Sequence, residues 1–103
     1  MKSFNDLINS AEVPVLVDFY ADWCGPCHMM APVIEDVADR LEGKAKVLKI
    51  DVDKNQAASV KYGIRSIPAL MLFYKGEILW RHSGVMSAGQ LINYLEPHLK
   101  AKA

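Results

Sequence analysis

The chain has 103 residues, which is enough for one domain with a single hydrophobic core and too few for several. Lys and Arg together number 12, and Asp and Glu together also number 12. This balanced charge gives no reason to expect a nucleic-acid or membrane-surface partner. No apolar run reaches the length of a membrane span, and the N-terminus lacks the apolar core of an export signal. We therefore expect a single domain over residues 1–103 in the reducing cytoplasm, where a lone cysteine pair is more often catalytic or metal-binding than structural.

The first half of the chain predicts a helix, a buried strand and a long amphipathic helix. Ser3 is placed to cap a short helix with an apolar face. Residues 15–20 are almost all apolar, as expected for a strand that is buried on both faces. Apolar side chains from Met29 to Leu41 recur at the spacing of one helix face, which predicts a helix that ends near Gly43.

The second half predicts a strand, a short helix, a hairpin and a last helix. A strand at 46–51 after the long helix implies a parallel pair with a right-handed crossover. A tight turn at Lys75-Gly76 should join two antiparallel strands. The remaining expected features are a short helix around 57–60 begun by Asp53 or Asn55, strands at 69–74 and 78–83, a capping box at Ser87, and a last helix that Pro97 ends or bends.

Both cysteines lie where the first strand meets the long helix. Cys24 is expected at the N-terminus of the helix, where unpaired backbone N–H groups and the helix dipole stabilise an anion. We therefore expect the pKa of the Cys24 thiol to lie below that of a free cysteine. Pro26 suits the first helical turn, and Cys27 follows one turn after Cys24 on the same side. These positions predict an attacking thiol and a resolving thiol that close into a disulfide and reopen.

The run Trp23-Cys24-Gly25-Pro26-Cys27, with Asp18 before it and Ile67-Pro68 after it, resembles the thioredoxin family over nearly the whole chain. The resemblance implies an α/β thioredoxin fold with a central mixed four-stranded sheet flanked by helices. Thioredoxins usually carry an extra strand before the first helix. This chain begins at about that helix, so we expect the N-terminal edge strand to be absent and that edge of the sheet to be bare.

The resemblance also implies an enzyme that reduces protein disulfides. The dipeptide Gly25-Pro26 between the cysteines matches the reducing members of the family. The expected partners are disulfide-containing client proteins and a thioredoxin reductase, and the expected state is a monomer. The reaction requires no bound cofactor and no metal.

Asp18 interrupts the apolar strand, where a charge is costly. Alternation along the strand puts Leu16, Asp18 and Tyr20 on one face. A buried carboxyl has a raised pKa and handles a proton near neutral pH. The resemblance implies that Asp18 lies beneath the disulfide and assists proton transfer, with Lys49 as its charge partner. The alternative is a solvent-facing Asp18 or a simple salt bridge.

Other site residues are carried over from the resemblance. Sequence alone favours a trans Ile67-Pro68 bond, whereas the family implies a cis bond beside the disulfide. That geometry would expose the Ile67 backbone for pairing with an extended substrate segment. The apolar surface around the disulfide would consist of Trp23, Ile67, Gly84 and Val85. The alternative for Trp23 is core packing.

Position 28 departs from the Lys or Arg that is common in the family. With His28 the chain matches the Cys-X-X-Cys-His pattern of covalent haem attachment. That reading conflicts with the lack of an export signal and with an ordinary amphipathic helix where a haem pocket should be. We instead expect His28 to be partly exposed and to tune the nearby thiolate. A zinc site is disfavoured because His82 and His98 lack ligand spacing to the two cysteines.

Overall fold

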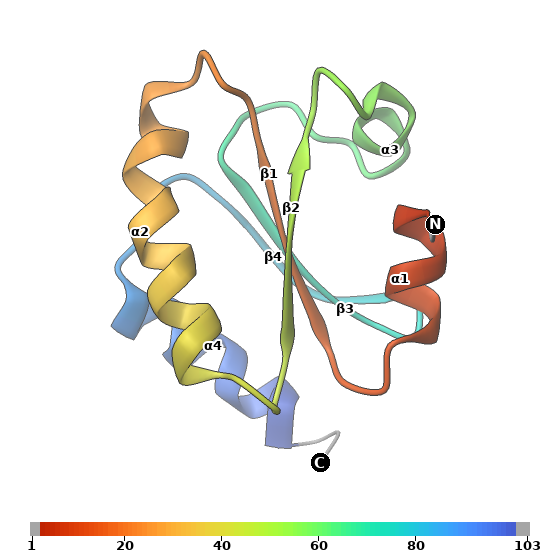
Figure 1. The fold of residues 1–103 in the computed structure, drawn as a ribbon, viewed down its shortest axis with the longest axis vertical. Coiled ribbons are helices and arrows are strands. Elements are labelled where there is room, and N and C mark those ends of the chain that lie inside the picture. The colour runs from red at the N-terminus through yellow and green to blue at the C-terminus, as the bar shows by residue number, and fades with distance from the viewer. Residues whose placement is uncertain (1–2, 101–103) are drawn as a thin grey trace.

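A mixed β-sheet between two layers of helices forms the molecule, as Figure 1 shows for the computed structural model, which describes residues 3–100. This architecture confirms the predicted fold class. Its elements in chain order are α1 (Phe4–Ser10), β1 (Val15–Tyr20), α2 (Gly25–Arg40), β2 (Lys46–Asp51), α3 (Gln56–Lys61), β3 (Ala69–Tyr74), β4 (Glu77–Ser83) and α4 (Ala88–Lys100).

The strand order is β2-β1-β3-β4, so β1 and β3 lie in the centre of the sheet. Strands β1 and β2 are parallel, as a crossover through α2 requires, and the other two pairs are antiparallel. The central position explains why β1 and β3 are nearly continuous apolar runs, because both faces of each strand are covered. Within residues 3–100 the sheet has four strands, as predicted, and β2 forms one of its edges.

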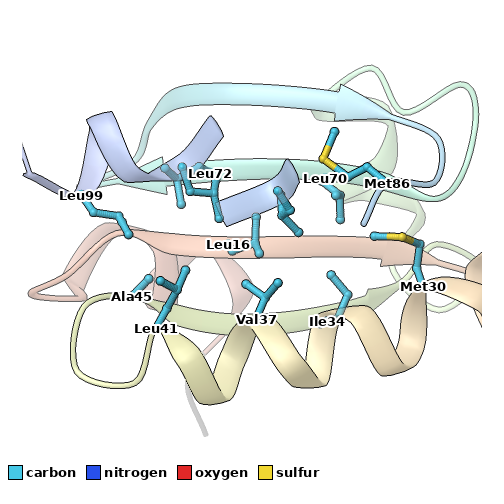
Figure 2. Packing of buried hydrophobic residues seen from close by; sticks show 12 residues of the cluster. Leu16, Met30, Ile34, Val37, Leu41, Ala45, Leu70, Leu72, Met86 and Leu99 are labelled. Carbon is cyan, nitrogen blue, oxygen red and sulfur yellow. The ribbon is translucent and has the colours of Figure 1, made fainter. Parts of the chain in front are cut away.

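The sheet separates two hydrophobic clusters. Helices α2 and α4 cover one face, and α1 and α3 cover the other (Figure 1). On the first face, Leu16 of β1 packs with Ile34 and Val37 of α2 and with the leucines of α4 (Figure 2). On the second face, the buried side chains are Ile8, Ala11, Val15, Val17, Phe19, Ala69, Met71 and Phe73. Successive residues of β1 therefore contribute to opposite cores.

Short-range signals in the sequence set the ends of several elements. Ser3 and Asp6 form a reciprocal capping box at the start of α1. Ser87 and Gln90 do the same before α4, where the Gln90 N–H donates to Ser87 Oγ over 3.2 Å. The hairpin between β3 and β4 turns at Lys75-Gly76, and both residues have positive φ, as a tight two-residue turn requires.

Two local predictions held only in part. Of the two outcomes predicted for Pro97, ending the helix is excluded, because α4 continues through it to Lys100. The buried Leu95 and Leu99 lie on either side of Pro97 and pack into one cluster, which holds the helix together across the lost hydrogen bond. Asn55 is the N-cap residue of α3, but its side chain does not cap the helix and its amide donates to the Asp51 carbonyl oxygen over 3.0 Å instead.

Candidate active site

Cys24 and Cys27 lie at the carboxyl end of β1, where the chain turns into α2. Cys24 is the N-cap residue of α2, and Pro26 occupies the first turn. The two cysteines are joined by a disulfide, and their Cα atoms are 5.3 Å apart. The structure thus brings together the pair that the sequence predicted, at the helix mouth where it was expected.

The Cys24 sulfur lies among groups that favour negative charge on it. The backbone N–H of Cys27 points at this sulfur over 3.2 Å, as an N-cap acceptor requires. The Ile67 carbonyl oxygen, 3.8 Å from the same sulfur, is an acceptor and does not contribute to this stabilisation. When the disulfide opens, the first-turn N–H and the helix dipole stabilise a thiolate at Cys24.

Little of either cysteine is open to solvent. Cys24 is 4% exposed and Cys27 is 5% exposed. A disulfide in a client protein must therefore be held against the protein surface before a sulfur can be reached. The residues around the cysteines decide how that contact is made.

Two of the apolar residues predicted to lie around the pair are exposed. Trp23 is 71% exposed and Val85 is 46% exposed, so core packing does not explain Trp23. The indole N–H of Trp23 donates to Asp53 Oδ2 over 2.9 Å, which fixes the ring at the surface. Gly25 and Pro26 are exposed as well. The structure therefore leaves flat apolar area next to the disulfide, where an apolar client segment can pack.

The loop before β3 completes this surface. The Ile67–Pro68 peptide bond is cis, and Ile67 is the residue whose carbonyl faces the Cys24 sulfur. The Pro68 carbonyl accepts a hydrogen bond from the Gly84 N–H over 2.9 Å, which ties this loop to the end of β4. Gly84 has φ +107°, a conformation that suits glycine.

Asp18 is buried beneath the cysteines. It is 1% exposed, and its Oδ1 has no hydrogen-bond partner among the described residues. Burial raises the pKa of Asp18 from 3.8 to about 6, and the positive charge of Lys49 opposes that rise. Lys49 is the register partner of Asp18 on β2, and its ammonium lies 5.0 Å from the centre of the Tyr20 ring.

Asp18 and Cys27 both line a cavity of about 190 Å³. Its lining residues are Asp18, Tyr20, Ala21, Asp22, Cys27, His28, Ala31 and Lys49. The predicted residues thus fall into two groups. One group surrounds this cavity, and the other, which includes Trp23, Ile67 and Val85, belongs to the surface beside the Cys24 sulfur.

Two contacts of the site were not predicted from the sequence. Asp53 binds the Trp23 indole from 30 positions away, and no local pattern indicates this pairing. His28 Nε2 lies 2.6 Å from the backbone carbonyl oxygen of Asp22. His28 is exposed, as expected, but its contact with the chain before Cys24 was not foreseen. Because the two cysteine sulfurs face each other, the arrangement favours disulfide exchange over haem attachment at this motif.

Comparisons with known proteins agree with this geometry. The family model described as Thioredoxin matches residues 1–97. The chain is 45% identical to a thioredoxin of Pseudomonas aeruginosa over 94% of its own length and 90% of that protein. It is 40% identical to a thioredoxin of Haemophilus influenzae, over 93% and 90% of the two chains. It is 47% identical to a thioredoxin-like protein of Synechocystis, over 91% and 90%.

Proposed function

Because this chain belongs to the thioredoxin family and is a protein-disulfide reductase, we propose that Cys24 is its attacking thiol and Cys27 its resolving thiol. The observation that carries this assignment is the position of Cys24 as the N-cap of α2, with the Cys27 N–H directed at its sulfur. Cys27 lies one turn further into the helix, away from the N-terminal end that stabilises an anion.

The reaction proceeds in two exchanges. The Cys24 thiolate attacks one sulfur of a client disulfide, and the other client sulfur leaves as a thiolate that takes a proton from solvent. Cys27 then loses its proton and attacks the Cys24 sulfur, which releases the second client thiolate. The client gains two electrons, and the cysteine pair loses two and becomes a disulfide.

Asp18 accepts the proton of Cys27 in the second exchange. This role is supported by the cavity that both residues line and by the unpartnered Asp18 oxygen. A carboxyl with a pKa of about 6 is mostly ionised at neutral pH, yet basic enough to take a proton for a short time. Lys49 limits the rise of this pKa and so keeps the carboxylate form available.

Client segments dock across the surface beside Cys24. The exposed area of Trp23 and Val85 supports apolar contact, and Gly25, Pro26 and Gly84 let a backbone approach closely. An extended client segment pairs with the backbone of Ile67, next to the cis Pro68. Main-chain pairing of this kind is compatible with many client sequences.

The proposed setting follows from the chemistry. We assign residues 1–103 to one domain that works in the cytoplasm as a monomer. Disulfide-containing proteins are the clients, and a thioredoxin reductase returns the pair to the dithiol. No helix among the described residues has the length and apolar character needed to cross a bilayer.

Reduction of insulin disulfides by the protein with dithiothreitol tests this function. We expect rapid turnover by the parent, and a stable mixed disulfide between insulin and Cys24 in a Cys27→Ser variant. The matched Cys24→Ser variant should trap no client, because Cys27 lacks the N-cap position that stabilises a thiolate. An inactive parent, or trapping through Cys27, would contradict the assignment.

A further inference from the structure

We propose that His28 is a positioning residue, whose imidazole holds the chain before Cys24 against α2 by a hydrogen bond to the Asp22 carbonyl. The inference rests on the disulfide-exchange function proposed above. It assigns to His28 a role through geometry, distinct from a role through charge on the thiolate.

The protonation of one ring nitrogen follows from its partner. His28 Nε2 lies 2.6 Å from the Asp22 carbonyl oxygen, and a carbonyl oxygen only accepts hydrogen bonds. Nε2 therefore carries a hydrogen and donates it. A neutral imidazole with this tautomer and an imidazolium can both make the contact.

The hydrogen bond spans the whole cysteine motif. His28 belongs to α2, and Asp22 lies in the turn that precedes Cys24. The backbone adds a second link, because the His28 N–H donates to the Cys24 carbonyl over 3.3 Å. His28 thus bonds through its side chain to the turn before the attacking cysteine, and through its backbone to that cysteine itself.

The side-chain link does not need the disulfide, but the disulfide strengthens it by holding the Cys24 segment against α2. In the oxidised protein the disulfide itself joins Cys24 to Cys27. Reduction removes that bond, but the contact between His28 and Asp22 involves neither sulfur. In the dithiol it keeps the Cys24 segment next to the helix and so maintains the effective concentration of one thiol toward the other.

The same contact forms part of the cavity next to the resolving thiol. Asp22 and His28 both line the cavity that contains Cys27 and Asp18. A loop released from His28 would change the wall of this cavity as well as the position of Cys24. We therefore expect His28 to affect the second exchange, in which Cys27 attacks Cys24, more than the first.

Three substitutions separate geometry from charge. In His28→Gln the side-chain amide N–H takes about the place of imidazole Nε2–H, without a charge. In His28→Asn the amide is one methylene too short to reach the same carbonyl. His28→Lys supplies a positive charge without a planar donor at the Nε2 position.

Two measurements on each full-length variant test the proposal. The first is the equilibrium constant for disulfide formation against a reference dithiol. The second is the rate at which Cys27 resolves a mixed disulfide preformed on Cys24. Only the part of this hydrogen bond that weakens when the disulfide opens changes these two quantities. A weakening comparable to an ordinary net hydrogen bond predicts about a fivefold loss of both in His28→Asn, and values within about twofold of the parent in His28→Gln. A fivefold loss corresponds to a potential roughly 20 mV less negative.

The outcomes are decisive in each direction. A His28→Asn variant with parental values overturns the proposal. Parental values in His28→Lys together with reduced values in His28→Gln also overturn it, because they would assign the effect to charge. Thermal unfolding of the oxidised variants checks that each is folded. In the parent, NMR should show the bonded Nε2–H proton exchanging faster in the dithiol than in the disulfide form, and equal protection in the two states also overturns the proposal. Insulin reduction by the parent tests the underlying function separately.

Discussion

The two faces of β1 are equally buried and chemically different. Val17 and Phe19 face the α1 side of the sheet, and both are fully shielded. Leu16 and Asp18 face the α2 side, and Asp18 is as shielded as its apolar neighbours. One face therefore only stabilises the fold, whereas the other gives up stability to keep a carboxyl group next to Cys27. The predictions below test this difference.

The largest expected effect is loss of packing on the purely apolar face. Phe19→Ala removes a fully buried ring from the cluster that includes Phe73. The lost transfer energy and the cavity left behind should lower the free energy of unfolding by about 3–5 kcal/mol. Urea denaturation of the oxidised protein measures this loss.

A matched substitution on the other face is the control. Leu16→Ala should cost about 2–5 kcal/mol, because Leu16 is equally buried in the α2 cluster. In the reduced and folded form of both variants, a small alkylating reagent should still modify Cys24 at the parental rate. A large change in that rate would mean that the apolar face also shapes the thiol site.

In contrast to the two preceding substitutions, Asp18→Asn should raise the free energy of unfolding at neutral pH. The native pKa of Asp18 is about 6 against 3.8 in the unfolded chain, so the native state binds more protons between these values. The stability contributed by Asp18 therefore falls as the pH rises through this window and stays lower above it. Asn avoids this loss, so the variant should be more stable than the parent at pH 7.5 by on the order of 2–3 kcal/mol.

The pH dependence supplies the control for this prediction. The advantage of Asp18→Asn should shrink as the pH falls from about 6 and vanish only well below pH 3.8, where the parent carboxyl is protonated in both states. The variant should also resolve mixed disulfides more slowly at neutral pH, since it has no carboxylate to accept the Cys27 proton. Equal stability at both pH values would show that Asp18 is not a charge held in the core.

Lys49→Met should have a smaller effect on stability, through the protonation equilibrium of Asp18. Lys49 lowers the pKa of Asp18, so its removal should raise that pKa above about 6 and extend the destabilising window to higher pH. Carbon-13 NMR titration of the Asp18 carboxyl group measures the shift. Lys46→Met on the same exposed strand is the control, because Lys46 is paired with Val15 and does not line the cavity. Equal shifts in both variants would point to net charge rather than to this pair.

Sequence alone predicted the parts of this site that depend on local chemistry. The apolar run of β1 and the helical spacing after Cys27 were enough to place the cysteines at a helix mouth. Asp18 stood out because a carboxyl in a buried strand is costly. The position of Lys49 opposite Asp18, and the role of Ile67-Pro68, came from family resemblance, since strand register and a cis bond are set by tertiary contacts.

The remaining contacts depend on where loops come together in space. Asp53 reaches Trp23 only because the segment after β2 returns beside the cysteine loop. The continuation of α4 through Pro97 depends on two leucines that pack across the proline, and local propensity does not include that packing. Such side-chain pairings have no period or motif in the chain, so they become visible only with the fold.

The smallest expected effect concerns the surface beside Cys24. Trp23→Phe keeps an exposed ring and removes the N–H that binds Asp53. Because the contact is exposed, the free energy of unfolding should fall by less than about 1 kcal/mol. The Trp23–Asp53 hydrogen bond orders the docking surface and takes no part in the exchange. Its loss should therefore raise the KM for a protein client more than it lowers kcat. Asp53→Ala should reproduce this pattern, and Asp53→Asn, which keeps an acceptor oxygen, should resemble the parent. An effect of Trp23→Phe that Asp53→Ala does not share would place the role of Trp23 in its ring alone.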